Sequence, residues 1–108
     1  MTLHDQPLVP ARLGETRLRG EALTALTSQL QAGWLVVDEH QLQRDFAIPD
    51  WRAAVVFVNA VADLAEAVNH HPEITLSSGN VRVVLWTHDV DGLHAADVVM
   101  AARIELLA

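Results

Sequence analysis

The densest group of chemically active side chains lies in the run from Glu66 to Glu73, which contains the adjacent pair His70-His71 followed by Pro72. Imidazoles titrate near neutral pH, so they can both donate and accept protons under ordinary conditions. Glu66 precedes His70 by four residues, a spacing that places both side chains on one face of a helix. A carboxylate there would fix the imidazole tautomer and favour its protonated form. The run therefore predicts acid–base histidines at the end of a helix, with the proline stiffening the exit.

A third histidine, His88, follows a strand-like segment, and Asp97 comes nine residues later. Because a helix end and a strand end can meet at one rim of a sheet, we expect these groups to share a site with the histidine pair. The ordinary alternative is that each histidine is exposed or serves as a favourable cation at a helix C-terminus. Three further histidines are expected to be plain surface residues: His4, His40 and His94.

A zinc site is the rival chemical interpretation, since three histidines and a glutamate can bind zinc. Adjacent histidines rarely reach one ion together, and the H-E-x-x-H spacing is absent, so we expect no metal. The chain has no cysteine, which excludes a thiol nucleophile and cysteine-based metal sites. It also has no phosphate-binding loop, dinucleotide fingerprint or nucleophile elbow.

The composition indicates one acidic domain. The chain has 108 residues, 51% of them hydrophobic, and 14 acidic residues against seven arginines, for a net charge of −7. Such a charge disfavours binding to nucleic acid or to anionic membranes. No apolar run approaches the length of a membrane-spanning helix, and the first ten residues do not read as a secretory signal. We therefore expect a cytoplasmic protein with no nucleic-acid or membrane partner.

The elements that must position the histidines follow from periodicity and from stop signals. Gly33 ends the first helical pattern, Asp50 can cap the second helix, and Pro72 cannot continue it. Alternation of apolar and polar residues predicts the strands, of which the segment ending at Thr87 is the clearest. The predicted helices span residues 21–32, 51–69 and 94–107, and the predicted strands span 34–38, 42–48, 74–77 and 81–87.

This order predicts an α+β domain of two layers, with a four-stranded antiparallel sheet and three helices on one face. The domain is expected to span residues 21–108. Residues 1–20 show no clear period and are interpreted as an N-terminal arm outside the core. The large aromatic residues are expected to belong to the core rather than to a substrate platform: Trp34, Phe46, Phe57 and Trp86.

The spacing of these residues resembles that of the pterin-4a-carbinolamine dehydratases. The similar positions are Glu66, His70-His71-Pro72-Glu73, Thr87-His88, Gly92-Leu93 and Asp97, and upstream Gly33-Trp34, Phe46, Asp50, Phe57, Ala65 and Asn69. The resemblance covers about residues 21–107. It implies the same two-layer fold, with an order of α-β-β-α-β-β-α, and assembly into a homodimer or homotetramer.

The resemblance also implies an activity, the dehydration of 4a-hydroxytetrahydropterin to quinonoid dihydropterin. This reaction recycles the pterin cofactor after aromatic amino-acid hydroxylation, and the family uses no metal or organic cofactor. By position, the acid–base residues would be His70, His71 and His88. The substrate-binding residues would be Glu66, Pro72, Glu73, Thr87, Asp89 and Asp97.

Three positions depart from the pattern of the family. Ile74 and Ser78 stand where aromatic residues are usual, and His94 stands where serine or threonine is common. Loss of stacking could weaken pterin binding or favour a different pterin. The alternative function is therefore a non-enzymatic member of the same fold that binds proteins, such as a Rubisco-assembly chaperone or a cofactor that dimerises a homeodomain factor. The intact set of histidines favours the enzyme.

Overall fold

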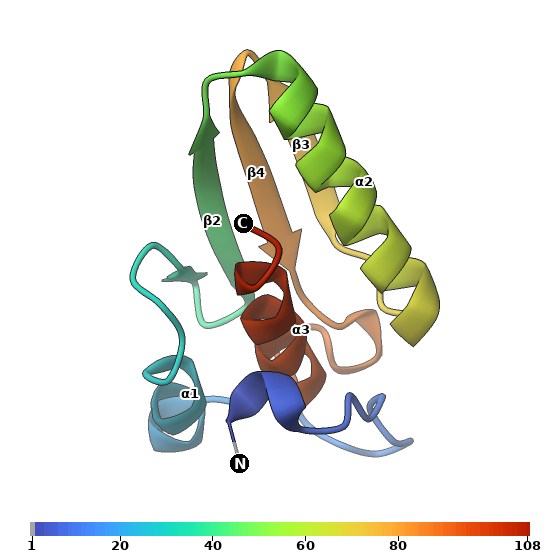
Figure 1. Cartoon of the computed structure of the whole chain (residues 1–108). Helices are drawn as coiled ribbons and strands as arrows, with labels where there is room; N and C mark the ends of the chain where they lie inside the picture. Colours follow the sequence, from blue (N-terminus) through green and yellow to red (C-terminus); the bar gives the residue numbers. More distant parts are fainter. Residues whose placement is uncertain (1) are drawn as a thin grey trace.

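The computed structural model describes residues 2–108, which form three α-helices and four strands (Figure 1). In chain order the elements are α1 (Gly20–Thr27), β1 (Leu35–Val37), β2 (Gln41–Ile48), α2 (Trp51–Val68), β3 (Glu73–Ser77), β4 (Gly79–Leu85) and α3 (Ala95–Glu105). A short 3-10 helix, η1 (Leu3–Asp5), precedes α1, and a second one, η2 (His88–Val90), lies between β4 and α3.

The four strands form one antiparallel sheet in the order β1-β2-β4-β3. The β3–β4 turn requires a positive φ at Gly79, which is 83°. The pairing aligns Leu42 with Leu85 and Phe46 with Val81, so the apolar residues of β2 and β4 share one face. Helices α2 and α3 cover the sheet and α1 lies beside α3 (Figure 1), which confirms the predicted α+β architecture.

Helix α2 has a defined start and a defined end, and both matter for the site. The Asp50 side chain accepts a hydrogen bond from the backbone N–H of Ala53 at 3.1 Å, as a helix cap does. At the other end Asn69 adopts the left-handed conformation, with φ 52°. The chain therefore turns sharply before His70 and His71, which lie outside the helix.

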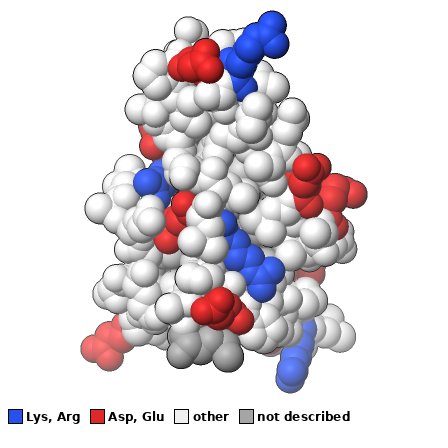
Figure 2. Space-filling view, viewed as in Figure 1, with Lys and Arg blue, Asp and Glu red and all other residues white. Residues whose placement is uncertain are grey.

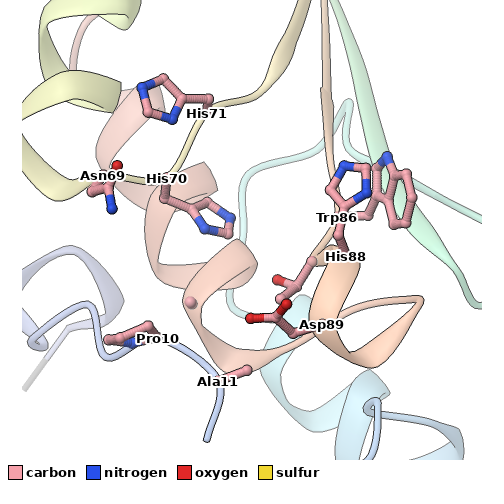
Figure 3. A pocket seen from close by; sticks show the side chains of 10 residues that line it. Pro10, Ala11, Asn69, His70, His71, Trp86, His88 and Asp89 are labelled. Carbon is pink, nitrogen blue, oxygen red and sulfur yellow. The ribbon is translucent and has the colours of Figure 1, made fainter. Parts of the chain in front are cut away.

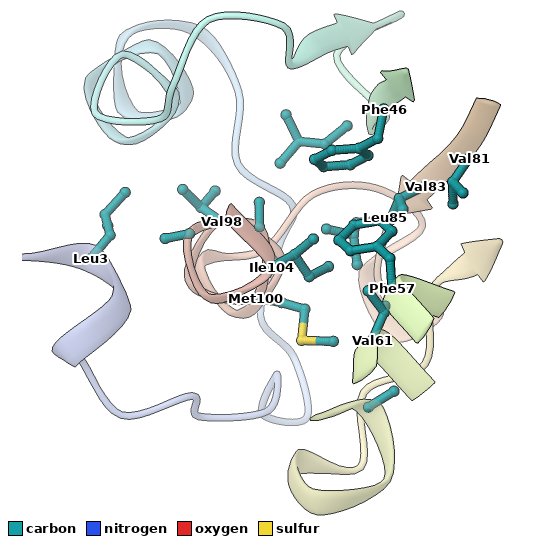
Figure 4. Packing of buried hydrophobic residues seen from close by; sticks show 14 of the residues in the cluster. Leu3, Phe46, Phe57, Val61, Val81, Val83, Leu85, Val98, Met100 and Ile104 are labelled. Atoms are coloured by element: carbon teal, nitrogen blue, oxygen red, sulfur yellow. The ribbon is translucent and has the colours of Figure 1, made fainter. Parts of the chain in front are cut away.

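Helix α3 lies at the centre of the molecule and supplies much of its core. Val98, Met100 and Ile104 are fully buried in the hydrophobic cluster around this helix, with Val98 on the side of Leu3 and Ile104 on the side of Phe57 (Figure 4). The Phe46 and Phe57 rings lie 4.8 Å apart, and the Trp34 ring meets Phe46 edge to face. These three aromatic residues belong to the core or pack against it, as predicted.

Most predicted boundaries differ from the structure by no more than two residues, and the end of the first helix differs by more. Helix α1 ends at Thr27 rather than at Ala32, because the N–H groups of Gln29 and Leu30 form a tighter turn with hydrogen bonds over three residues. Strand β4 ends at Leu85 rather than at Thr87, because the chain leaves the sheet to form η2. The second difference moves Trp86, Thr87 and His88 off the sheet and into the rim of the molecule.

The N-terminal segment contributes to the core, which the sequence did not predict. Leu3 is 5% exposed and packs in the cluster around α3. The Arg103 guanidinium donates a hydrogen bond to the backbone oxygen of Gln6 at 2.7 Å. The expectation that the whole segment stands outside the core was therefore wrong, because an apolar side chain near the chain start covers one side of α3.

The surface in Figure 2 carries acidic and arginine side chains interspersed, with no large area of one sign. None of the described helices combines the length and the apolar character that crossing a membrane would require.

Candidate active site

A cleft of about 390 Å³ opens where the end of α2, the segment after β4, the start of α3 and the N-terminal segment meet (Figure 3). A volume of this size suits a small organic molecule. The cleft is lined by Pro10, Ala11, Asn69, His70, His71, Trp86, Thr87, His88, Asp89 and Ala96. All three predicted acid–base histidines therefore face one cavity.

His70 is held by a buried carboxylate. Its Nε2 lies 2.6 Å from Oδ1 of Asp97, which sits in the first turn of α3 and has no exposed surface. The other carboxylate oxygen accepts hydrogen bonds from the Thr87 hydroxyl at 2.7 Å and from the backbone N–H of His94 at 3.0 Å. A carboxylate surrounded by donors acts as an acceptor only, so the His70 Nε2 carries a proton and Nδ1 is the nitrogen that remains to exchange one.

His71 is paired with Glu66 at the mouth of the cleft. The Nε2 of His71 lies 2.7 Å from Oε1 of Glu66, and both side chains are exposed. The predicted pairing of Glu66 with His70 was wrong, because that spacing assumes a helix through residue 70. The left-handed Asn69 ends the helix one residue earlier and brings His71, not His70, back toward the carboxylate.

His88 stacks on Trp86. The two ring centroids lie 3.8 Å apart at 37°, and His88 is exposed at the start of η2. Trp86 also contacts the His40 ring, at a centroid distance of 4.6 Å, and His40 Nε2 lies 3.1 Å from an Asp91 oxygen. The prediction that Trp86 belongs to the core was wrong, since it is only partly buried and lines the cleft. His40 is likewise partly buried rather than a plain surface residue.

His94 is buried, contrary to the expectation of a surface residue. Its Nδ1 accepts a hydrogen bond from the backbone N–H of Ala96 at 3.1 Å, and its Nε2 lies 2.9 Å from Oε2 of Glu15. Its own backbone N–H donates to Asp97, which completes a capping box at the start of α3. The spacing His94-x-x-Asp97 is that of a capping box, so the sequence held a signal for this role.

Only some of the remaining predicted residues line the cleft. Thr87 and Asp89 line the cleft, although the Thr87 hydroxyl is turned toward Asp97. Asp97 lies behind His70, and Pro72 and Glu73 lie outside the set of lining residues. Sequence reasoning missed four other lining residues: Pro10, Ala11, Asn69 and Ala96. No recognisable motif marks Pro10 and Ala11.

Electrostatics favour an ionised Glu15 beside the cleft. Its pKa is lowered from the ordinary value of 4.5, first by the hydrogen bond from the backbone N–H of Arg12 and then by that from His94. Among residues 2–108, no group of three histidine or carboxylate side chains is arranged to hold a metal ion.

Comparison with known proteins identifies a family match over most of the chain. Residues 16–107 match the family described as Pterin 4 alpha carbinolamine dehydratase. A protein of Rubrobacter xylanophilus is 44% identical over 97% of both chains, and one of Alkaliphilus metalliredigens is 35% identical over 95% of this chain and 93% of its own. Both carry the name "Putative pterin-4-alpha-carbinolamine dehydratase".

Two solved structures are similar in fold. A transcriptional coactivator/pterin dehydratase from Brucella melitensis has a TM-score of 0.79 and 31% identity, covering 86% of this chain and 99% of its own. A pterin dehydratase-like protein described as a RuBisCO assembly factor in the alpha-carboxysome has a TM-score of 0.58 and 26% identity, covering 67% and 83%.

Proposed function

We propose that the cleft dehydrates a 4a-hydroxytetrahydropterin by histidine acid–base catalysis, on the premise that the chain belongs to the pterin-4-alpha-carbinolamine dehydratase family. Membership makes the chain a hydro-lyase of the pterin dehydratase type. The observation that carries the mechanism is the convergence of His70, His71 and His88 on one cleft.

The reaction needs two proton movements. The hydroxyl on C4a leaves as water once it receives a proton, and ring nitrogen N5 loses its proton as the C4a–N5 double bond forms. Imidazoles with ordinary pKa values near 6.5 serve as acid and as base at neutral pH. Three histidines around one cavity place a donor and an acceptor near a flat bicyclic ring at the same time.

Of the three cleft histidines, His70 has the best-defined tautomer. Because its Nε2–H is directed to Asp97, its Nδ1 is the atom that would receive a proton or deliver one. Asp97 is buried behind the ring and does not line the cleft, so we assign it a positioning role rather than direct contact with substrate. Glu66 orients His71 in the same way from the mouth.

The pterin would lie among the lining residues. Trp86 supplies an aromatic surface to the cleft, in a chain that has Ile74 and Ser78 at the two positions where aromatics are usual in the family. Asp89 and backbone groups near Thr87 supply polar contacts to the ring system. The remaining substrate-binding assignments, Pro72 and Glu73, rest on position in the sequence alone.

The test is dehydration of freshly generated 4a-hydroxytetrahydropterin, followed by absorbance, for the wild type and for His71→Ala. We expect the wild type to accelerate the reaction and the variant to lose about 10²- to 10⁴-fold of that acceleration. Absence of acceleration by a folded wild-type protein would refute the proposal. Metal analysis of the same preparation tests the zinc alternative, because a stoichiometric metal would favour it.

A second candidate is a protein-binding role, favoured by the similarity to the RuBisCO assembly factor. A folded protein that is inactive in the dehydration assay but forms a stable complex with a partner protein would support this role. We also propose that the chain forms at least a homodimer. Its cytoplasmic location, and the absence of nucleic-acid and membrane partners, stay predictions from the composition.

A further inference from the structure

One wall of the cleft comes from the N-terminal segment, far in sequence from the histidines. Pro10 and Ala11 line the cavity below His70 and Asp89 in the view of Figure 3. The segment is tied down at both ends. The Gln6 oxygen accepts a hydrogen bond from Arg103 of α3, and the Leu18 N–H donates to the Leu93 oxygen at 2.7 Å. The wall therefore belongs to a loop of about eleven residues that spans two anchors.

Glu15 fastens this loop between its anchors. Its Oε1 accepts a hydrogen bond from the backbone N–H of Arg12 at 2.7 Å, which closes a turn directly after the wall residues. Its Oε2 meets the Nε2 of His94 at 2.9 Å. Glu15 thus joins the turn that follows Pro10 and Ala11 to the first residues of α3.

The tautomer of His94 determines the direction of this contact. Its Nδ1 accepts from the backbone N–H of Ala96, so Nδ1 carries no proton and the proton of the neutral ring lies on Nε2. The ring therefore donates to Glu15. The Nδ1 of His94 caps α3, and its Nε2 holds the loop through Glu15. A residue at position 94 that could cap the helix but could not reach Glu15 would therefore release the loop.

We propose that Glu15 is a positioning residue that acts through His94 to hold residues 10–14 as a wall of the cleft, and that this wall determines how tightly the pterin is bound. The inference rests on the proposed function for the identity of the ligand. Glu15 lies outside the set of lining residues, and it pairs with His94 rather than with a cleft histidine. Its removal should therefore weaken substrate binding rather than the chemical step.

The variants follow from the two roles of His94. Glu15→Ala removes the contact, and Glu15→Gln keeps an oxygen that can accept from His94. His94→Ser retains a side chain that caps helices well but cannot reach Glu15. Glu21→Ala, which removes an exposed carboxylate from α1, is the matched control.

The first measurement is limited trypsin digestion of the full chain without ligand, with cleavage at Arg12 resolved by mass spectrometry. Loss of a hydrogen bond to a charged group should raise the cleavage rate at Arg12 by about tenfold in Glu15→Ala and in His94→Ser. Glu15→Gln should restore part of the protection, and Glu21→Ala should match the wild type. Unchanged cleavage at Arg12 in Glu15→Ala would overturn the proposal.

The second measurement is steady-state dehydration by the same proteins. We expect KM to rise by about tenfold in Glu15→Ala and His94→Ser with kcat nearly unchanged, and the double variant to be no worse than either single variant. A fall in kcat at constant KM would overturn the proposal, because it would mean that Glu15 helps to position His70 for the chemical step. A wild type without activity, together with faster Arg12 cleavage in Glu15→Ala, would refute the dehydratase function and still support the contact that holds the loop.

Discussion

His70 and Asp97 are 27 residues apart in the sequence, and their side chains meet at 2.6 Å. The contact joins the segment after α2 to the first turn of α3, so the position of a cleft histidine depends on how the last helix begins. Asp97 is fully buried, and its second oxygen is bound to Thr87 and to the backbone of His94. The Asp97 carboxylate therefore caps helix α3, holds the Thr87 hydroxyl just after β4 and fixes the tautomer of His70.

Replacement of Asp97 by asparagine tests this arrangement. An amide offers one acceptor oxygen where the carboxylate uses two, so one of the groups that now donate to Asp97 would lose its acceptor. We expect kcat to fall by about 10- to 100-fold, by analogy with the loss of groups that orient a functional histidine. We also expect the free energy of unfolding in urea to fall by about 1–3 kcal/mol, because a buried donor loses its partner. Asp63→Asn, on the exposed face of α2, is the control.

Wild-type kcat in a folded Asp97→Asn protein would show that the chemistry does not depend on the His70–Asp97 pair.

Trp86 is expected to contribute aromatic surface to the cleft, beside the His88 ring that stacks on it. Trp86→Leu should raise KM by about three- to tenfold, the range of an aromatic contact, whereas Trp86→Phe should keep most of the affinity. Bound pterin should also quench less tryptophan fluorescence in Trp86→Phe than in the wild type. Trp51→Phe, at the exposed start of α2, is the matched control. Equal KM values for the wild type and Trp86→Leu would exclude a role of the Trp86 ring in pterin binding.

Much of the fold follows from local patterns in the sequence. Apolar alternation in the segment from Val81 to Leu85, the cap at Asp50 and the stop before Pro72 each act within a few residues. These signals placed the sheet and α2 close to where the structure has them. The convergence of His70, His71 and His88 was also expected, since a helix end and a strand end meet at the same rim.

Some errors came from contacts that no local pattern encodes, and others from local signals that were misinterpreted. The burial of Leu3 and the entry of Pro10 into the cleft depend on residues far away in the chain. The partner of Glu66 was misassigned because one left-handed residue, Asn69, changes the direction of the backbone. The role of His94 was missed although its capping-box spacing with Asp97 was readable, because histidine is an unusual cap.

The ion pair of Asp45 and Arg82 on the outer face of the sheet should make the stability of the fold depend on pH in the acid range. The Arg82 guanidinium lies 2.8 Å from Asp45 and lowers the pKa of that carboxyl below its ordinary value of 3.8. Because the pKa of Asp45 is lower in the folded state than in the unfolded state, ionised Asp45 stabilises the fold at pH values above its ordinary pKa. This contribution is lost as the pH falls through the folded-state pKa. Asp45→Asn should therefore destabilise the protein near neutral pH and much less in strong acid.

Urea unfolding of the wild type and of Asp45→Asn, near neutral pH and in strong acid, measures this difference. A destabilisation of equal size at both would show that the side chain acts through packing rather than through its charge. Because both groups are well exposed, the effect at neutral pH should be small and should shrink in high salt.

The proposed assembly is testable through the apolar residues that the chain leaves exposed. Leu35 on the edge strand β1 and Trp51 and Val56 on α2 are all more than half exposed. Light scattering at micromolar concentration should give at least twice the chain mass of 11.8 kDa. A monomer mass would contradict the proposed homodimer.

The most direct test of the central claim is chemical rescue of His70→Ala by free imidazole in the dehydration assay. If Nδ1 of His70 moves a proton in the reaction, the variant should lose about 10²- to 10⁴-fold in kcat, and imidazole should restore part of the rate in proportion to its concentration. Asp97, Thr87 and the helix cap remain in the variant, so imidazole can occupy the vacated position beside the carboxylate. A folded His70→Ala protein with wild-type kcat would contradict the account.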